Sequence, residues 1–325
     1  MKCRHWFAVS AFALALALGG GPALAQSYPN KPIRLQVPFA PGGSTDIIAR
    51  VIAEPLSKAL GQPVVVENRS GNGGVVGTTE IARAVPDGYL LGMTTVSTSA
   101  ANPAINPQIP YNTLADLTPI VNIAATPNVI AVHPGFPARN YREFIAEIKK
   151  NPGQYSYASS GTGGIAHLQT ELFKSLTGTF IAHIPYRGSG PALIDTVAGR
   201  VQIIFDTLPS TLPFIQQKRL IPIVVAASQR LAVLPDVPTF KEVGLEPVNR
   251  MNFCGILGPK GLPRELVDKI NAATLKGLQD PVVRKRIEDS GAVIVGNSPE
   301  QFAAQIKAEY EVYKKVVSTA KLKLE

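Results

Sequence analysis

Four glycine-rich turns contain the residues that are best suited to binding chemistry. They are Pro38–Asp46 (PFAPGGSTD), Ser159–His167 (SSGTGGIAH), Pro185–Pro191 (PYRGSGP) and Asn68–Val75 (NRSGNGGV). Each turn follows an apolar strand pattern and begins an amphipathic helix pattern. The first amide groups of a helix have no acceptor within the helix, and they lie at the positive end of its dipole. Turns of this type can therefore bind an anion such as a carboxylate.

The number of these turns matters more than any one of them. For Pro38–Asp46 alone, an ordinary strand-to-helix turn is an equally good interpretation. Gly42 and Gly43 would let the backbone approach a ligand closely, and Ser44 is expected to cap the helix. One helix N-terminus favours an anion by roughly 0.3–1 kcal/mol when exposed and up to about 2 kcal/mol when partly buried. Several termini that converge in a closed cleft would form a carboxylate site made mainly of backbone.

The second turn also fits a dinucleotide-binding pattern. Gly161, Gly163 and Ala166 match G-x-G-x-x-A, which requires an acidic residue about 20 positions later. Residues 182–185 are Ala-His-Ile-Pro, so the acidic residue is missing and no cofactor is expected. The hydroxyl groups of this turn would instead add hydrogen-bond donors for a ligand; they belong to Ser159, Ser160 and Thr162.

Three of the titratable residues in or near these turns are candidates for the ligand site. Arg187 could pair with a ligand carboxylate, or it could lie in solvent or join two lobes. Asp206, at the end of a strand, could accept a hydrogen bond from a ligand ammonium or hydroxyl, or it could cap the helix near Ser210. His167 lies in the first turn of a candidate ligand helix, where it would make a polar contact or support the structure.

The sequence gives little basis for catalysis or metal binding. It contains no G-x-S-x-G, P-loop, H-E-x-x-H or C-x-x-C motif. His133, His167 and His183 are not spaced as metal ligands with one another or with a cysteine or carboxylate. Cys254 lies in an apolar run and is expected to be a small buried side chain. We therefore expect no catalytic residues and no metal, and do not expect an enzyme.

Residues 1–25 have the pattern of a cleaved export signal. Lys2 and Arg4 precede the apolar run Trp6–Leu18, and Ala23-Leu24-Ala25 suits signal peptidase, which predicts Gln26 as the mature N-terminus. The run is too short for a retained membrane anchor, and no later segment is apolar enough to span a bilayer. The sequence thus predicts a periplasmic protein that is not itself embedded in the membrane.

The charge pattern limits the possible partners. The net charge of +9 is spread along the chain, and the basic run Arg284–Arg286 is flanked by acidic residues. Without a basic stripe interleaved with aromatic residues, a nucleic-acid partner is not expected. A mildly positive chain favours anionic ligands.

Short apolar runs alternate with amphipathic segments from residue 33 onward. Strands are expected at 33–37, 64–67, 89–93, 129–132, 155–158, 181–185, 201–205, 221–226 and 253–257. Helices are expected at 44–60, 75–84, 140–150, 165–176, 190–198, 263–278 and 299–321. This alternation predicts an α/β fold with mostly parallel sheets flanked by helices. The last helix has one apolar stripe and should pack across a lobe as a clamp.

Several segments, in this order, resemble the Bug (TctC-like) family, the extracytoplasmic receptors of tripartite tricarboxylate transporters. They are 28–34, 38–46, 61–69, 86–89, 159–167, 185–191, 198–201 and 234–239. The resemblance covers almost the whole chain after the export signal. One departure is Pro55 inside the first helix, which is expected to kink the helix or end its regular hydrogen bonding.

The resemblance implies a two-lobed periplasmic-binding-protein-like fold, the Venus flytrap. Lobe 1 would comprise residues 26–125 and 234–325, and lobe 2 would comprise 126–233, with crossings near 124–128 and 226–235 that act as a hinge. Such a receptor captures a small carboxylate, an acidic amino acid or a di- or tricarboxylate, and passes it to membrane transporter subunits. The candidate ligand-binding residues are Phe39, Ala40, Gly42, Gly43, Ser44, Thr95, Ser97, Ser159, Ser160, Gly161, Thr162, Gly163, His167, Arg187, Gly188, Ser189 and Asp206.

Two other functions remain open at this point. A periplasmic hydrolase or transferase on a similar scaffold would need a nucleophile–base pair or a metal. A ligand sensor for a two-component kinase would bind its ligand by the same physics, and only its membrane partner would distinguish it.

Overall fold

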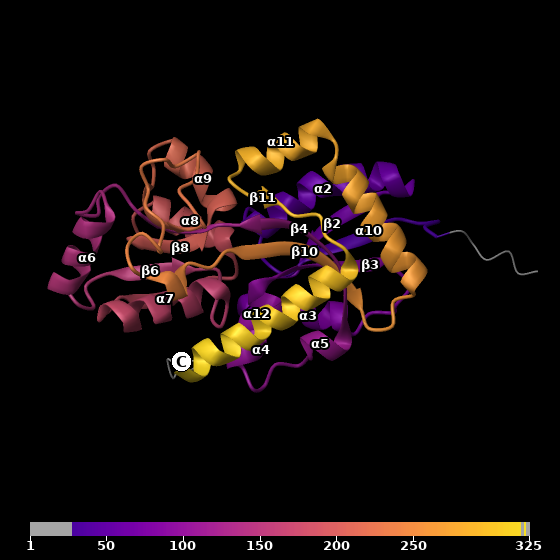
Figure 1. Cartoon of the computed structure of the whole chain (residues 1–325), viewed down its shortest axis with the longest axis horizontal. Helices are drawn as coiled ribbons and strands as arrows, with labels where there is room; N and C mark the ends of the chain where they lie inside the picture. The colour runs from indigo at the N-terminus through magenta and orange to yellow at the C-terminus, as the bar shows by residue number, and fades with distance from the viewer. Residues whose placement is uncertain (1–27, 320–321, 323–325) are drawn as a thin grey trace, which may run out of the picture.

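The computed structural model describes residues 28–319 and 322, so the predicted export signal at 1–25 lies outside the described residues. Two sheets lie side by side along the long axis of the molecule, each covered by helices (Figure 1). The α/β class with two lobes is thereby confirmed. No helix in the described part of the chain has the length and apolar character needed to cross a bilayer.

The first lobe is built on a six-stranded sheet with the order β11-β4-β10-β3-β1-β2. Its strands are β1 (Ile33–Val37), β2 (Val64–Asn68), β3 (Leu90–Thr95), β4 (Leu117–Thr126), β10 (Asn252–Pro259) and β11 (Val293–Ile294). Its main helices are α2 (Ser44–Leu60), α3 (Val75–Ala82), α10 (Arg264–Leu278), α11 (Pro281–Asp289) and α12 (Pro299–Thr319). Shorter helical segments are η1 (Asn72–Gly74), the π-helical turn η2 (Ser97–Ala101), α4 (Asn102–Ile105) and α5 (Thr113–Asp116).

The second lobe is built on a five-stranded sheet with the order β7-β6-β8-β5-β9. Its strands are β5 (Asn128–Val132), β6 (Ser156–Ser159), β7 (Ala182–Pro185), β8 (Ile203–Thr207) and β9 (Ile221–Ala226). Its helices are α6 (Tyr141–Lys150), α7 (Ile165–Thr177), α8 (Ser189–Val197), α9 (Leu208–Gln216) and the short η3 (Glu246–Val248).

The expectation of mostly parallel sheets is wrong. Strand β1 pairs in parallel with β2 and β3, and β6 pairs in parallel with β7 and β8. The strands that begin or end at the lobe crossings, β4, β5 and β10, pair antiparallel with their neighbours, as do β9 and β11. A strand that enters a lobe from the other lobe starts at the edge where the parallel strands end, so it must run against them.

Helix α2 covers one face of the first sheet. Its residues Ile48, Ile52 and Leu56 recur at every fourth position and are fully buried in the core of this lobe. Pro55 does not end the helix, which continues to Leu60, as its predicted range requires, and terminates at Gly61 in the left-handed conformation. Pro55 instead packs against α10 at Gly277, where an added Cβ would lie 3.0 Å from the Cβ of the proline.

The chain crosses between the lobes twice. The first crossing is at Pro127, between β4 and β5, within the range expected. The return lies at residues 249–251 and not near 226–235, because the intervening segment packs on the second lobe. Phe240 and Val248 are fully buried in the core of that lobe, and the amide of Phe240 donates to the carbonyl of Val225 at 2.9 Å. We therefore propose that lobe 2 comprises residues 128–248.

Helix α12 packs across both lobes. Phe302 and Ile306 share a buried cluster with Val96 of the first lobe and with Ile165 and Leu168 of α7 in the second. The apolar stripe of this helix thus joins the two lobes, in addition to covering one of them (Figure 1).

Replacing Phe302 with alanine should destabilise the fold. The ring is fully buried and packs edge to face on Phe253, with the ring centroids 5.2 Å apart. Removing a buried phenylalanine ring typically costs about 3–5 kcal/mol of unfolding free energy, which urea denaturation would measure. Lys307→Ala on the exposed face of the same helix is the control and should change stability by less than about 0.5 kcal/mol. Equal stability of the two variants would contradict the burial of the stripe.

Candidate functional site

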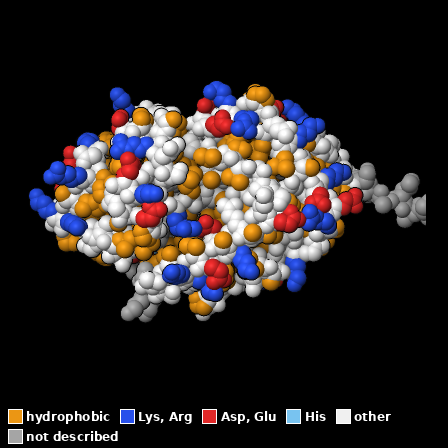
Figure 2. Space-filling view, viewed as in Figure 1, with side chains coloured by type: hydrophobic (Ala, Val, Ile, Leu, Met, Phe, Trp, Pro, Cys, Tyr) orange, Lys and Arg blue, Asp and Glu red, His pale blue; other side chains and the backbone are white. Residues whose placement is uncertain are grey.

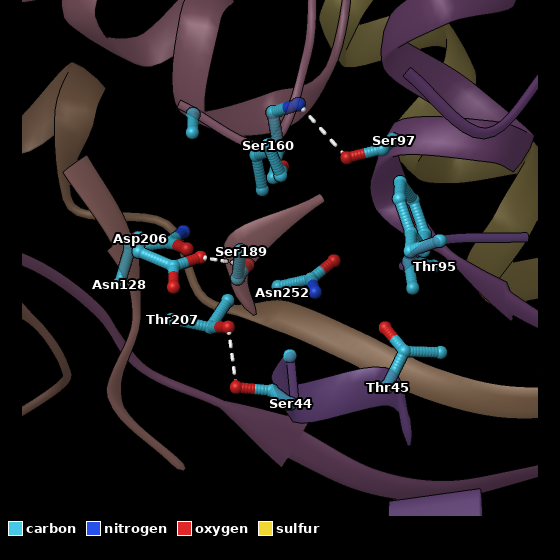
Figure 3. A pocket seen from close by; sticks show the side chains of 14 residues that line it. Ser44, Thr45, Thr95, Ser97, Asn128, Ser160, Ser189, Asp206, Thr207 and Asn252 are labelled. Atoms are coloured by element: carbon cyan, nitrogen blue, oxygen red, sulfur yellow. Dashed lines mark hydrogen bonds between the residues drawn. The ribbon is translucent and has the colours of Figure 1, made fainter. Parts of the chain in front are cut away.

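A crevice between the two lobes encloses a small cavity (Figure 3). It lies where the parallel strands of both sheets end and where the antiparallel strands β5 and β10 begin. The centre of a water-sized sphere can move through only about 30 Å³ of it, so the lobes are closed. The lining consists of Phe39, Gly43, Ser44, Thr45, Thr95, Ser97, Asn128, Ser160, Ile165, Ala166, Ser189, Asp206, Thr207 and Asn252.

Three helix N-termini reach this crevice. The lining includes Gly43 and Ser44 at the start of α2, Ile165 at the start of α7 and Ser189 at the start of α8. All three helices follow glycine turns identified in the sequence. The fourth turn does not line the cavity, but Gly73 in it contacts the other lobe at Thr162. The turns therefore share one crevice, and their helix dipoles place positive ends on it.

The hydroxyl of Ser44 connects the lobes and does not cap its own helix. Gly43 occupies the N-cap position of α2 and makes no side-chain cap. The Ser44 oxygen instead accepts from the Thr207 hydroxyl at 2.6 Å and from the Ser210 amide at 3.0 Å, and Ser44 donates to the Ser210 hydroxyl. It thus caps α9 of the other lobe. Figure 3 shows its hydrogen bond with Thr207.

Ser97 does the same for helix α7. Its hydroxyl accepts a hydrogen bond from the amide of Ile165 at 3.0 Å, and α7 has no capping side chain of its own at Gly164. Two serines of the first lobe therefore satisfy the first turns of two helices of the second lobe. A capping hydroxyl typically stabilises a helix by about 0.5–2 kcal/mol, so these contacts favour the closed arrangement.

Glycines let the two main chains touch across the crevice. The amide of Ala40 donates to the carbonyl of Arg187 at 3.1 Å. A Cβ added at Gly190 would lie 2.1 Å from the carbonyl oxygen of Pro41, and one at Gly161 would lie 2.9 Å from the backbone of Gly73. Neither approach is possible for any residue with a side chain unless the lobes separate.

Asp206 is the acidic side chain among the residues that line the crevice. It is 3% exposed, and its two carboxylate oxygens accept from the hydroxyls of Ser189 at 2.6 Å and Ser210 at 2.7 Å. Burial raises the pKa of this carboxyl, against the lowering effect of the two hydroxyl hydrogen bonds. No lysine, arginine or histidine is among the residues that line the cavity in the described part of the chain. Positive potential there comes from backbone amides.

His167 and His183 support the second turn from behind. The two imidazole rings stack at 4.2 Å between centroids, and Tyr157 stacks on the other face of His183 at 4.7 Å. The Nδ1 atom of His167 accepts from the amide of Gly163 at 3.1 Å, and the Nε2 atom of His183 lies 2.7 Å from the Ser159 hydroxyl. These histidines fix the turn and do not line the cavity.

The candidate residues from the sequence divide into two groups. Eight line the cavity: Phe39, Gly43, Ser44, Thr95, Ser97, Ser160, Ser189 and Asp206. The others lie outside it: Ala40, Gly42, Ser159, Gly161, Thr162, Gly163, His167, Arg187 and Gly188. The amide of Gly42 is directed to the Asp46 carboxylate at 3.1 Å, and the Arg187 side chain is exposed on the surface.

Sequence reasoning missed six lining residues. Thr45, Ile165, Ala166 and Thr207 each lie beside a residue or turn that was identified, so a wider reading of the same segments would include them. Asn128 and Asn252 have no such signal, because their place depends on the two lobe crossings.

Lys and Arg side chains are scattered over the face in Figure 2 and form no continuous basic patch there. Within the residues that the structure describes, no group of three His, Cys, Asp or Glu side chains could hold a metal ion.

Known proteins resemble this chain over most of its length. A family model described as tripartite tricarboxylate transporter family receptor matches residues 48–322. Protein BugT of Bordetella pertussis is 36% identical over 325 residues, which cover 100% of both chains.

Solved structures share the fold. One described as a periplasmic transporter is 49% identical with a TM-score of 0.91, covering 92% of this chain and 100% of its own. Rpa4515 of R. palustris, solved with adipate, is 32% identical with a TM-score of 0.87 and coverages of 90% and 98%. MatC of Rhodopseudomonas palustris, solved with bound malate, is 32% identical with a TM-score of 0.86 and coverages of 89% and 100%.

The Gly190→Ala variant should keep its fold but lose lobe closure. Gly190 lies in α8, where alanine is favoured over glycine by about 1 kcal/mol, so the lobe itself should be as stable or more stable. The added methyl would overlap the carbonyl of Pro41, so we expect a larger radius of gyration in small-angle X-ray scattering. Gly43→Ala is the milder control, because its Cβ would lie 3.2 Å from the Ser189 Cβ. Unchanged scattering in both variants would contradict the closed contact.

The stability of the protein should fall with acid partly through His183. Burial lowers the pKa of this imidazole to about 3 from 6.5, and the charges of His167 and Lys174 add to the effect. Between these two values the unfolded state binds the extra proton, so unfolding free energy decreases as pH falls from about 6.5 toward 3, by at most about 1.4 kcal/mol per pH unit for one proton. His183→Gln should flatten this part of a denaturation profile. If the unaltered protein and His183→Gln show the same dependence of unfolding free energy on pH, His183 is excluded as a cause of the acid destabilisation.

Proposed function

The chain belongs to the receptor family of tripartite tricarboxylate transporters, and we propose that it is a periplasmic receptor that captures a small carboxylate between its lobes. The proposal extends to delivery of the ligand to membrane transporter subunits and to export through the signal at residues 1–25. The solved structures with adipate and malate support a carboxylate as the ligand class.

The observation that carries the proposal is the convergence of α2, α7 and α8 on one closed cavity. Because the lining residues include no basic side chain, a bound carboxylate would be held by helix N-terminal amides and hydroxyls. Each terminus favours an anion by up to about 2 kcal/mol when partly buried. Three of them together would provide the several kcal/mol that a receptor needs.

Closure of the lobes would couple binding to recognition by the transporter. The Ser44 and Ser97 caps and the contact of Gly190 with Pro41 form only when the lobes meet. A ligand that bridges the lobes shifts the equilibrium toward this closed state. The transporter subunits would then distinguish loaded from empty receptor by the closed surface.

The serine–histidine pair of the second lobe is poorly suited to catalysis. Ser159 and His183 are 2.7 Å apart, an arrangement that sequence spacing did not reveal. Ser159 is fully buried and does not line the cavity, and a pKa of about 3 makes His183 a weak base at neutral pH. We therefore favour binding without turnover over the hydrolase or transferase alternative.

Binding of dicarboxylates to the chain from Gln26 onward tests this function. Isothermal titration calorimetry with adipate, malate and succinate should show saturable binding by at least one acid, whereas adipamide, which is uncharged, should not bind. At a concentration 100-fold above its Kd the ligand should add about 2.7 kcal/mol of stability in a thermal melt. Mass spectrometry should recover the acid unchanged. Chemical change would favour an enzyme, and failure of every di- and tricarboxylate would refute the proposal.

A further inference from the structure

Two polar atoms of the cavity lining have no hydrogen-bond partner. The Asn128 side chain is fully buried and Thr95 is 2% exposed, yet Asn128 Oδ1 and Thr95 Oγ1 are unpaired within the described residues. Asn128 comes from the second lobe and Thr95 from the first, and they lie on opposite sides of the cavity (Figure 3). Buried polar atoms normally have a hydrogen-bond partner. Two such atoms without one, in a crevice between lobes, therefore indicate groups whose partner is a ligand.

The orientation of the Asn128 amide is fixed by its neighbours. Its Nδ2 donates to Gln169 Oε1 at 3.0 Å and to the carbonyl oxygen of Arg250 at 2.9 Å. Gln169 Nε2 donates to the same carbonyl at 3.1 Å. A carbonyl oxygen can only accept, so both amide nitrogens must face it. The unpaired atom of Asn128 is therefore an acceptor, and a ligand must bring the donor.

Asp206 strengthens this acceptor character. It lies on β8 and pairs with Val129 of β5, whereas Asn128 pairs with Thr207, so Asp206 and Asn128 leave opposite faces of the sheet, and both line the crevice at the end of these strands. Each Asp206 oxygen already accepts one serine hydroxyl, and a carboxylate can accept further hydrogen bonds. Acceptor oxygens that the second lobe directs into the crevice favour an O–H or N–H group of a ligand and disfavour a second carboxylate beside them.

We propose that Asn128 and Thr95 select a carboxylic acid that also carries a hydroxyl or ammonium donor over the plain dicarboxylate of the same length. The inference rests on the proposed function, since the helix N-termini would hold the carboxylate while Asn128 and Thr95 would bind the donor group. The Thr95 hydroxyl, which can both donate and accept, would complete the contact from the first lobe.

Three four-carbon acids test the selection on the unaltered protein. Succinate, L-malate and L-aspartate share one skeleton and differ at C2 by hydrogen, hydroxyl or ammonium. Calorimetry should show malate or aspartate binding about 5- to 150-fold tighter than succinate, the range expected when a buried acceptor gains its partner. Adipate, 2-hydroxyadipate and 2-aminoadipate repeat the comparison for a longer skeleton. The better of the hydroxyl and ammonium acids identifies the donor.

The outcomes separate this inference from the function itself. A plain acid that binds as tightly as its substituted partners in the set that binds would overturn the selection and leave the receptor function intact. If neither set binds, the proposed dicarboxylate function and the selection both fail.

Matched variants assign the selection to the two residues. Asn128→Ala should bring the affinities of the plain and substituted acids within about twofold of each other, whereas Gln169→Ala breaks the same amide cluster but leaves the crevice acceptor in place and should keep their ratio. Thr95→Val should lower the ratio, and Thr113→Val is its control, because Thr113 is also a buried threonine with an unpaired hydroxyl but lies outside the crevice. A ratio that Asn128→Ala leaves unchanged would overturn the proposal.

Discussion

Two helices of the second lobe, α7 and α9, obtain their capping hydroxyls from the first lobe. Ser97 accepts from the first turn of α7, and Ser44 accepts from the first turn of α9. Helix N-terminal amides must find an acceptor, a ligand or water. The need to satisfy them brings the two lobes together at the place where the glycine turns leave room for main chain to approach main chain. The crevice, its polarity and its closure all follow from this shared need.

The same constraint explains why the crevice contains hydroxyls and amides and not basic side chains. An arginine in so small a space would need to lose its hydration and fill the volume that a ligand requires. Main-chain donors occupy little volume, and they are held in place by the helices behind them. Asp206 fits this scheme because two serine hydroxyls satisfy it, although burial still disfavours its charge. The arrangement gives a site in which position, more than formal charge, decides what binds.

The sequence predicted the repeating parts of the fold well. Strand β1 and helix α2 have the bounds expected, because the alternation of apolar and polar residues in β1 and the apolar residues at every fourth position of α2 depend on local sequence alone. Strand β4 was missed because buried Asn122 and partly buried Pro119 interrupt its apolar pattern, and the Asn122 amide nitrogen donates to Gln305, which is distant in the sequence. Helix α9 was expected only as a helix near Ser210 and was given no bounds, because Pro209 and Pro213 suggest a loop, although the first lies in its first turn. Asn128 and Asn252 could not be placed in the crevice without knowing where the chain crosses between lobes.

Asn128 immediately follows Pro127 at one crossing, and Asn252 immediately follows residues 249–251 at the other. Both asparagines line the crevice beside the crossings that we expect to act as the hinge between the lobes. Residues at a hinge move less than the rims of the lobes. A side chain there can therefore contact the ligand while changing its own position little during opening. Substitutions of these two asparagines that change the preferred ligand would also alter the opening motion of the lobes. Ligand specificity and the opening motion of the lobes would therefore change together.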